Sequence, residues 1–217
     1  MRYLILIFAL TPAVQMISQS TTQSFDKVCI DGNVEVLLRP DDMYDVDIIE
    51  SKDDVTFTVH DGRLDIFRAD GLSNESAMVT INYKTLSSVD VSSGASVEHE
   101  GILNADTLLL KADSSAEMNL KINAQMVKSY VANESNLTLQ GKINSLKATC
   151  DSDSELNAGS LEAVKVWIHT ENNSSATVNA SNHVDADAKS GSSIKILGDP
   201  ETSEVNSSMG GEIIADK

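Results

Sequence analysis

Aromatic side chains are scarce in this chain: phenylalanine, tyrosine and tryptophan make up 4% of its 217 residues, and Trp167 is the only tryptophan. A core with so few rings must be filled by aliphatic side chains, which suits a thin core that repeats along the molecule. None of the four histidines forms an H-x-x-x-H pair or lies in a cysteine-rich spacing, so no zinc site is predicted. The sequence also lacks G-x-S-x-G, the P-loop and G-x-G-x-x-G, which are signatures of common hydrolases and nucleotide-binding proteins.

Basic residues are also few, 16 against 33 acidic residues, which gives a formal net charge of −17. Such a chain repels nucleic acids and anionic membrane surfaces, so neither is expected as a partner. The acidic stretches Asp41-Asp42 and Asp151-Ser-Asp153 lack the loop of an EF-hand and the nonapeptides of calcium-binding β-rolls. We interpret them as turns, which aspartate and serine favour, and we predict no metal and no cofactor.

Long hydrophobic runs are absent except near the N-terminus, where Met1-Arg-Tyr3 precedes the short apolar run LILIFALTPAV. One positive charge before such a run is typical of a secretory signal peptide, and the run is too short to span a bilayer. We therefore predict a signal peptide over residues 1–19, cleaved between Ala13 and Thr21. The mature protein is expected in the periplasm or at the cell surface, without a membrane span.

What the chain does contain is an internal repeat. Each copy has a small or apolar anchor residue, three polar turn residues, one small residue, one polar residue and one apolar residue, as in Val91-SSG-Ala95-Ser-Val97. The copies follow one another at spacings of 18–21 residues, and their anchors are Val91, Ala112, Val131, Cys150, Thr170, Ala188 and Ser207. A repeat of this length is typical of solenoids, in which each coil buries its apolar face against the next.

The residues around each anchor alternate between apolar and polar, which is the period of a β-strand with one buried face. The sequence therefore predicts an all-β protein whose C-terminal part is a single-stranded, right-handed parallel β-helix of about seven coils, with strands roughly 4.8 Å apart. The small column that contains Ser135, Ser154 and Ser174 fits a tight corner where stacked serines can hydrogen-bond along the ladder. The alternative architecture is a β-sandwich with turns at similar spacing.

Two cysteines and one histidine are expected on inward strand positions. We favour two separate buried thiols, Cys29 and Cys150, although an oxidising compartment also allows a disulfide between them. His99 falls on an inward column eight residues after the first anchor, so we interpret it as a hydrogen-bonded interior residue.

Residues 20–85 are less regular, but their alternation still predicts strands near residues 27–30, 34–38, 44–49, 55–59, 63–67 and 78–83. His60-Asp-Gly-Arg63 predicts a tight hairpin turn, and Pro40-Asp-Asp42 predicts another turn. We expect this section to close the N-terminal end of a solenoid formed by residues 86–217, because an open sheet edge invites aggregation. Residues 20–217 are then one structural domain.

Several motifs resemble a known family, and they are Ile30-Asp-Gly-Asn-Val-Glu-Val-Leu-Leu-Arg-Pro40, Val46-Asp-Ile-Ile49, Asp61-Gly-Arg-Leu-Asp-Ile66 and Val89-Asp-Val-Ser-Ser-Gly-Ala95. They are similar to the head GIN domain of putative auto-transporter adhesins over roughly residues 25–213. The resemblance implies an exported bacterial protein with a single-stranded right-handed β-helix and a role in adhesion. It implies no catalytic residues.

Outward columns beside the anchors predict a binding face. If the coils stack in register, six residues share one flat surface, and they are Lys111, Lys128, Tyr130, Lys147, Trp167 and His169. Leu109 belongs to the same surface. An exposed tryptophan beside lysines is typical of ligand or partner sites, and on an acidic chain it favours an acidic glycan or an anionic protein patch. In the alternative interpretation, Trp167 packs under a loop and the lysines only relieve acidic repulsion.

We therefore predict a non-catalytic surface or periplasmic binding and adhesion protein whose partner is a glycan or a protein. The enzyme alternative is a pectin lyase or hydrolase, by analogy with other β-helix proteins. Hydrolysis needs two carboxylates across one bond, whereas Asp90, Glu117 and Glu155 are expected on different columns. A third hypothesis is a scaffold that forms homo-oligomers through its solenoid ends, using the coil at Gly210-Gly-Glu-Ile-Ile214.

Overall fold

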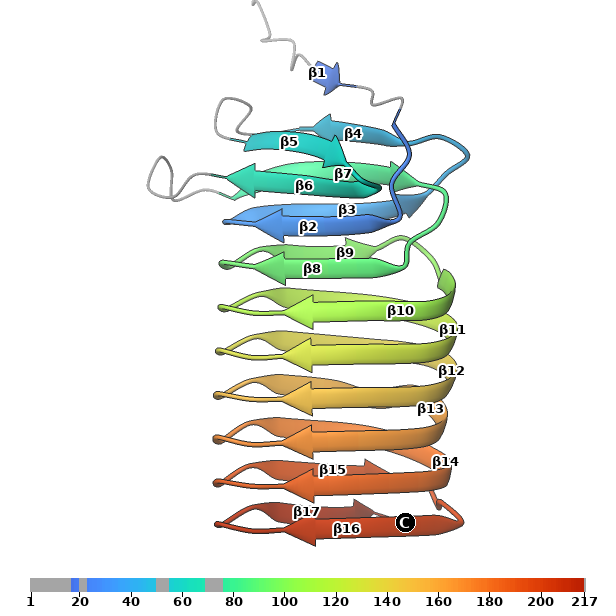
Figure 1. Ribbon diagram of the computed structural model, residues 1–217, viewed down its shortest axis with the longest axis vertical. Helices are drawn as coiled ribbons and strands as arrows, with labels where there is room; N and C mark the ends of the chain where they lie inside the picture. Colours follow the sequence, from blue (N-terminus) through green and yellow to red (C-terminus); the bar gives the residue numbers. More distant parts are fainter. Residues whose placement is uncertain (1–16, 20–22, 50–54, 69–75, 217) are drawn as a thin grey trace, which may run out of the picture.

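The computed structural model describes residues 17–19, 23–49, 55–68 and 76–216, and in these ranges it contains strands and turns but no helix. The strands are β1 (Ile17–Gln19), β2 (Lys27–Asp31), β3 (Val34–Pro40), β4 (Asp45–Ile48), β5 (Val55–His60), β6 (Arg63–Arg68), β7 (Ala77–Tyr83), β8 (Ser88–Ser92), β9 (Ser96–His99), β10 (Leu103–Ala112), β11 (Glu117–Val131), β12 (Asn136–Cys150), β13 (Glu155–Thr170), β14 (Ser175–Ala188), β15 (Ser193–Leu197), β16 (Thr202–Ser207) and β17 (Glu212–Asp216). They wind into a tall stack of coils (Figure 1), so the predicted all-β solenoid is confirmed.

The anchors of the repeat pair with one another coil by coil. Ala112 pairs with Val91 on one side and with Val131 on the other, in parallel register. The ladder continues through Cys150, Thr170 and Ala188 to Ser207. Leu137 and Leu156 are likewise direct partners in β12 and β13, so the β-sandwich alternative is wrong.

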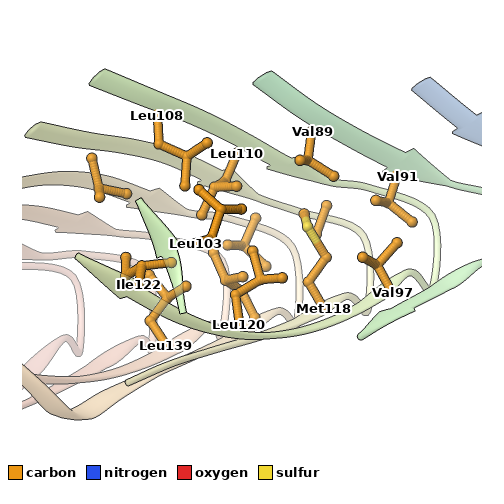
Figure 2. Close-up of a cluster of buried hydrophobic side chains, with 14 of the residues drawn as sticks. Val89, Val91, Val97, Leu103, Leu108, Leu110, Met118, Leu120, Ile122 and Leu139 are labelled. Carbon is orange, nitrogen blue, oxygen red and sulfur yellow. The ribbon is translucent and has the colours of Figure 1, made fainter. Parts of the chain in front are cut away.

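Strands β11, β12, β13 and β14 are unusually long, with 15, 15, 16 and 14 residues, because each one runs through both halves of a coil and bends between them. Inside the coils, aliphatic side chains from the two halves face each other (Figure 2), with Val89 and Leu110 on one side and Met118 and Leu120 on the other. This interior is thin enough to be filled without rings, which explains why the chain needs so few aromatic residues. The burial of these apolar columns supplies the main driving force for stacking.

Each repeat turns through two consecutive residues with left-handed backbone, for example Ser114 (φ 57°) and Ser115 (φ 62°). Glycine, asparagine and aspartate tolerate this conformation best, which accounts for much of the polar turn signal in the repeat. The turns stack as well: the Ser115 N–H donates to the Asn133 carbonyl at 2.8 Å, and the Glu134 N–H donates to the Ser152 carbonyl at 3.0 Å. The hydrogen-bonded ladder therefore continues through the turns.

Buried serines follow the turns, as the small column predicted. The Ser154 hydroxyl donates to the Val131 carbonyl at 2.9 Å, and the Ser174 hydroxyl donates to the Cys150 carbonyl at 2.9 Å. Hydrogen bonding along the ladder is thus confirmed, but the acceptors are backbone carbonyls of the preceding coil rather than neighbouring serines. A small hydroxyl suits this corner because it fits the space and satisfies a buried carbonyl.

The N-terminal section adds two further coils to the stack. Strands β2 and β3 pair in parallel with β8 and β9 on one side and with β6 and β7 on the other. From β2 onward, the chain therefore starts within the stack, builds outward to β6 and β7, and returns past the coil of β2 and β3 to β8. Antiparallel strands lie at this end: β1 pairs with β4, β4 with β7, and β5 with β6 (Figure 1). The predicted hairpin turn between β5 and β6 is confirmed, with Asp61 (φ 50°) and Gly62 (φ 74°) at its tip.

The prediction for Cys29 is wrong, whereas that for Cys150 is confirmed. Val28 and Ile30 point into the core, so Cys29 between them points outward and is half-buried beside Asp90. Its position was assigned from its apolar character, but the alternation of β2 places it on the other face. Both cysteines are free thiols, and burial raises the pKa of Cys150 to about 12.

His99 is a hydrogen-bonded, half-buried residue, as predicted. Its Nε2 atom shares a hydrogen bond with the Tyr83 hydroxyl, and the two rings lie 5.9 Å apart between centroids. Burial lowers the pKa of His99 and raises the pKa of Tyr83 to about 12, so both groups are neutral at physiological pH.

The predicted signal peptide, residues 1–19, lies outside the described residues except for the three residues of β1. In the part of the chain that the structure describes, no helix has the length and hydropathy to span a membrane.

Candidate binding face

The six predicted site residues lie on one surface of the stack, contributed by β10, β11, β12 and β13. Residues two apart on a strand point to the same side, and paired residues are adjacent between coils. One column therefore runs Leu109, Lys128, Lys147 and Trp167, and its neighbour runs Lys111, Tyr130, Thr149 and His169. We call this surface the lysine–tryptophan face, and it is defined by Lys111, Lys128, Tyr130, Lys147, Trp167 and His169.

Trp167 occupies an outward position and is partly buried by side chains of the neighbouring coils. The Lys147 ammonium lies 5.4 Å from the centroid of the Trp167 ring, within range of a cation–π interaction. The His183 ring lies 5.6 Å from the Trp167 ring between centroids, tilted by 55°. These two contacts on the indole come from strands β12 and β14 rather than from a loop.

Acidic residues neutralise only part of this face. Lys111 lies 3.2 Å from Asp113 and 4.0 Å from Asp90, and His169 lies 3.1 Å from Asp187. Burial opposes the charged form of Lys111, but its hydrogen bond to Asp113 and the charge of Asp90 raise its pKa overall.

The central lysines differ from Lys111. Among the described residues, neither Lys128 nor Lys147 has a carboxylate within ion-pair distance. Both side chains are exposed, so the uncompensated positive charge of the face is concentrated at these two neighbouring residues.

An open hollow of about 530 Å³ lies within the face. It brings together Lys128, Lys147, Trp167 and His169, whereas Lys111 and Tyr130 lie outside its lining. Its lining also includes Ser129 and Ala148, whose side chains point into the stack, and Asp185 and Asp187 form its C-terminal rim.

Two further residues near the hollow were missed from the sequence. Lys165 and His183 are direct partners in the next outward column, five residues before the anchors. Lys165 is exposed, and His183 packs on Trp167. The predicted binding face comprises the outward columns one and three residues before the anchors. The column five residues before the anchors would have identified both Lys165 and His183.

The outward acids are arranged differently from the expectation. Glu117 and Glu155 stand in one column, separated by Asn136, so the prediction that they occupy different columns is wrong. Two strand spacings place their backbones roughly 10 Å apart. Glu117 lines a hollow of about 380 Å³ that does not include Glu155, and Asp90 lies on the other half of the coil. Within the described ranges, no three His, Cys, Asp or Glu residues gather as a metal site.

These features define a parallel β-solenoid that presents one face with a partly buried indole and two lysines that have no acidic partner in the described part of the chain. A family model described as "Putative auto-transporter adhesin, head GIN domain" matches residues 24–200, and the chain belongs to this family. The family is described as adhesins and not as enzymes, which implies a binding partner and suggests an exported or surface location.

Solved structures with a similar fold include proteins from Bacteroides and Parabacteroides species. A putative adhesin from Bacteroides fragilis is 18% identical, with a TM-score of 0.84 over 96% of this chain and 100% of that chain. A putative adhesin from Parabacteroides merdae is 16% identical, with a TM-score of 0.72 over 94% and 97%. A protein from Parabacteroides distasonis described as a putative lipid binding protein is 15% identical, with a TM-score of 0.67 over 94% and 96%. A comparison with curated proteins finds no match.

Proposed function

We propose that the chain is an exported, non-catalytic binding and adhesion protein of the periplasm or cell surface, and that its ligand docks on the lysine–tryptophan face. The observation that carries this proposal is the charge of the face. Lys128 and Lys147 have no acidic partner among the described residues, although the chain as a whole has a net charge of −17. A locally positive patch on an acidic surface selects anionic ligands and suppresses others by repulsion.

The chemistry of the hollow favours an acidic glycan. Two lysine ammonium groups can pair with a carboxylate or sulfate, and the indole offers a flat apolar surface on which a sugar ring can pack. Asp185 and Asp187 at the opposite rim repel the same anion, which directs it toward the lysines. An anionic patch on a partner protein meets the charge requirement as well, and it is the alternative ligand.

Retention of the protein on immobilised polyanions tests the proposal. Heparin and polygalacturonate represent sulfated and carboxylated glycans, and polyglutamate represents an acidic protein patch. We expect the double variant Trp167→Ala/Lys147→Ala to lose retention on at least one of them while its far-ultraviolet CD spectrum stays unchanged. Added salt should weaken the retention of the wild type, because exposed charges are screened within about 10 Å at 0.1 M ionic strength.

A matched control lies at the other end of the stack, where the Lys84 ammonium stands 5.9 Å from the centroid of the Tyr44 ring. Lys84→Ala removes a lysine from an aromatic ring without touching the face, so its retention should equal that of the wild type. Unchanged retention of the Trp167→Ala/Lys147→Ala variant would remove the proposal.

A second proposal concerns the C-terminal end. Strand β16 pairs with β14 and β17 pairs with β15, and among the described residues no strand pairs with their outer edges. Val205 and Ile214 are 57% and 51% exposed there. We propose that two copies associate through these edges. Because antiparallel strands already lie at the other end, a closed two-fold dimer is expected rather than a filament.

Sedimentation velocity over a range of concentrations tests this dimer. The wild type should show a dimer that increases with concentration. Ala215→Pro should abolish it, because Glu212 donates its N–H to β15 and the N–H of Ala215, three residues on, points to the outer edge, where proline removes it. A wild type that stays monomeric at every concentration contradicts the proposal.

A further inference from the structure

The two ends of each coil differ. One end is the tight turn with left-handed residues, and the other is the wide bend inside β11, β12, β13 and β14 (Figure 1). At this bend the paired inner residues are mostly alanines: Ala105 pairs with Ala124, Ala124 with Ile143, and Ile143 with Ala163. Small inward side chains here let the strand curve closely around the core.

Two hollows of about 550 and 370 Å³ lie along the bend, and both are lined by Asn123, Ala124 and Gln125. Together they form one elongated depression, which we call the bend groove. It extends over six coils, from Ser87 before β8 to Ser181 in β14. With strands about 4.8 Å apart, the groove is roughly 24 Å long.

Amide side chains line the middle of the bend groove. The Asn123 amide donates to the Asn104 side-chain oxygen at 3.0 Å, and the Asn144 amide donates to the Gln125 side-chain oxygen. Each amide has two N–H donors and an oxygen with two lone pairs, so each of these bonds leaves donors and acceptors free. The amides are held in position by their neighbours and can still bind a ligand through the rest of their hydrogen-bonding groups.

The charges along the bend groove do not favour an ionic ligand. Lys142 and Glu162, which line its second half, neutralise each other across 2.8 Å. Asp26 and Asp106 line the other half and repel anions. The exposed Val164 adds apolar surface beside the amides. The lining therefore combines uncharged donors and acceptors with small apolar patches, which is the chemistry that recognises polyhydroxylated rings.

We propose that the bend groove is a second binding site, for an extended, uncharged oligosaccharide that lies along the axis of the stack. Its hydroxyl groups exchange hydrogen bonds with Asn104, Asn123, Gln125 and Asn144, and the carbon face of a ring packs against the exposed Val164. The length of the groove matches several sugar units in a row. The site is separate from the lysine–tryptophan face and does not depend on the function proposed for that face.

Isothermal titration with neutral linear hexasaccharides tests this site, using cellohexaose, xylohexaose and mannohexaose as probes. We expect at least one of them to bind the wild type. Asn123→Ala/Gln125→Ala should weaken that binding by about tenfold or more, because it removes two central hydrogen-bonding side chains. Asn123→Asp/Gln125→Glu, which keeps the side-chain shapes but adds charge, provides a second variant if the first is unstable.

The matched control is Asn136→Ala/Thr138→Ala. These two polar residues are two positions apart on the outward face of β12, like Asn123 and Gln125 on β11, and they lie outside the groove. This control and Trp167→Ala/Lys147→Ala should both bind the neutral hexasaccharide like the wild type, and melting temperatures should show that all variants are folded. The proposal is overturned if no neutral hexasaccharide binds, or if the control loses as much affinity as the groove variants. Retention on polyanions is measured for the same variants. Loss of hexasaccharide binding then reports on the groove, and loss of polyanion retention reports on the lysine–tryptophan face.

Discussion

The two ends of this stack of coils are completed in different ways. At the N-terminal end, antiparallel strands lie beside the parallel coils, and Val46, Ile48 and Val55 of these strands are buried. At the C-terminal end the repeat keeps its pattern, yet its inward residues are open. Val205 is 57% exposed, whereas its partner one coil earlier, Ala186, is 0% exposed. Burial in this fold is therefore provided by the next coil and not by the residue type alone.

The same difference applies to the backbone. Strands β4 and β7 exchange hydrogen bonds in antiparallel register, but the outer edges of β16 and β17 face no described strand. An exposed sheet edge is a template for pairing with another chain. A second chain that pairs with this edge would therefore both assemble with the protein and stabilise its C-terminal coil.

The largest effect that separates the two regions is expected for core truncation. Leu156 is fully buried between Leu137 and Ala176, so Leu156→Ala should lower the free energy of unfolding by about 2–5 kcal/mol. Ile213, at the same place in the last coil, is only partly buried, and Ile213→Ala should cost less than about 1 kcal/mol. Urea unfolding followed by circular dichroism measures both. Equal losses would contradict the view that the following coil provides the burial.

A smaller effect sharpens the comparison within the middle coils. The Ser154 hydroxyl is bonded to the Val131 carbonyl and accepts from the Asp151 N–H at 3.1 Å, so Ser154→Ala should cost about 1–3 kcal/mol. The Ser129 hydroxyl is also buried, but it has no hydrogen-bond partner among the described residues. Ser129→Ala should therefore leave stability unchanged or raise it by about 1 kcal/mol. The opposite order of the two unfolding midpoints would refute this assignment of the hydrogen bonds.

The smallest effect is expected to be the same in both regions. Ser115 (φ 62°) in a middle turn and Met209 (φ 48°) in the last turn both have left-handed backbone. Ser115→Gly and Met209→Gly should each stabilise the protein by about 0.5–1 kcal/mol, because the strain belongs to the residue itself. Thermal unfolding measures both gains. A gain at Ser115 without one at Met209 would show that even backbone strain depends on the neighbouring coil.

Much of the fold could be predicted because the repeat is a local pattern with a fixed spacing. All seven anchors pair as their spacing indicated, and the buried serines lie where the small column placed them. The position of β2 and β3 between two later coils could not be predicted. These strands alternate like the others, and their partners are set by long-range pairing that no local spacing records. The misassignment of Cys29 has a related cause, because residue type was weighed above the alternation of Val28 and Ile30.

The candidate site was predicted in position but not in electrostatics. The columns that hold Lys128, Lys147 and Trp167 follow directly from the repeat. The repeat does not predict which lysines are neutralised by acidic residues, because the pairing of Lys111 with Asp113 depends on how far their side chains reach at a turn. The bend groove was not recognised at all, since its signal is a column of alanines that also fits an ordinary buried strand.

The central claim is that residues about one repeat apart become direct neighbours, and disulfide formation between introduced cysteines tests it most directly. Asn136 and Glu155 are exposed partners on adjacent coils, whereas Ser175 lies one coil further along the same column. In a Cys29→Ser background, Asn136→Cys/Glu155→Cys should form an intramolecular disulfide on mild oxidation. Asn136→Cys/Ser175→Cys should not, because two strand spacings exceed the reach of a disulfide, about 7 Å between Cα atoms. A failure of the first pair to cross-link, or equal cross-linking of both pairs, would contradict the stacked-coil account.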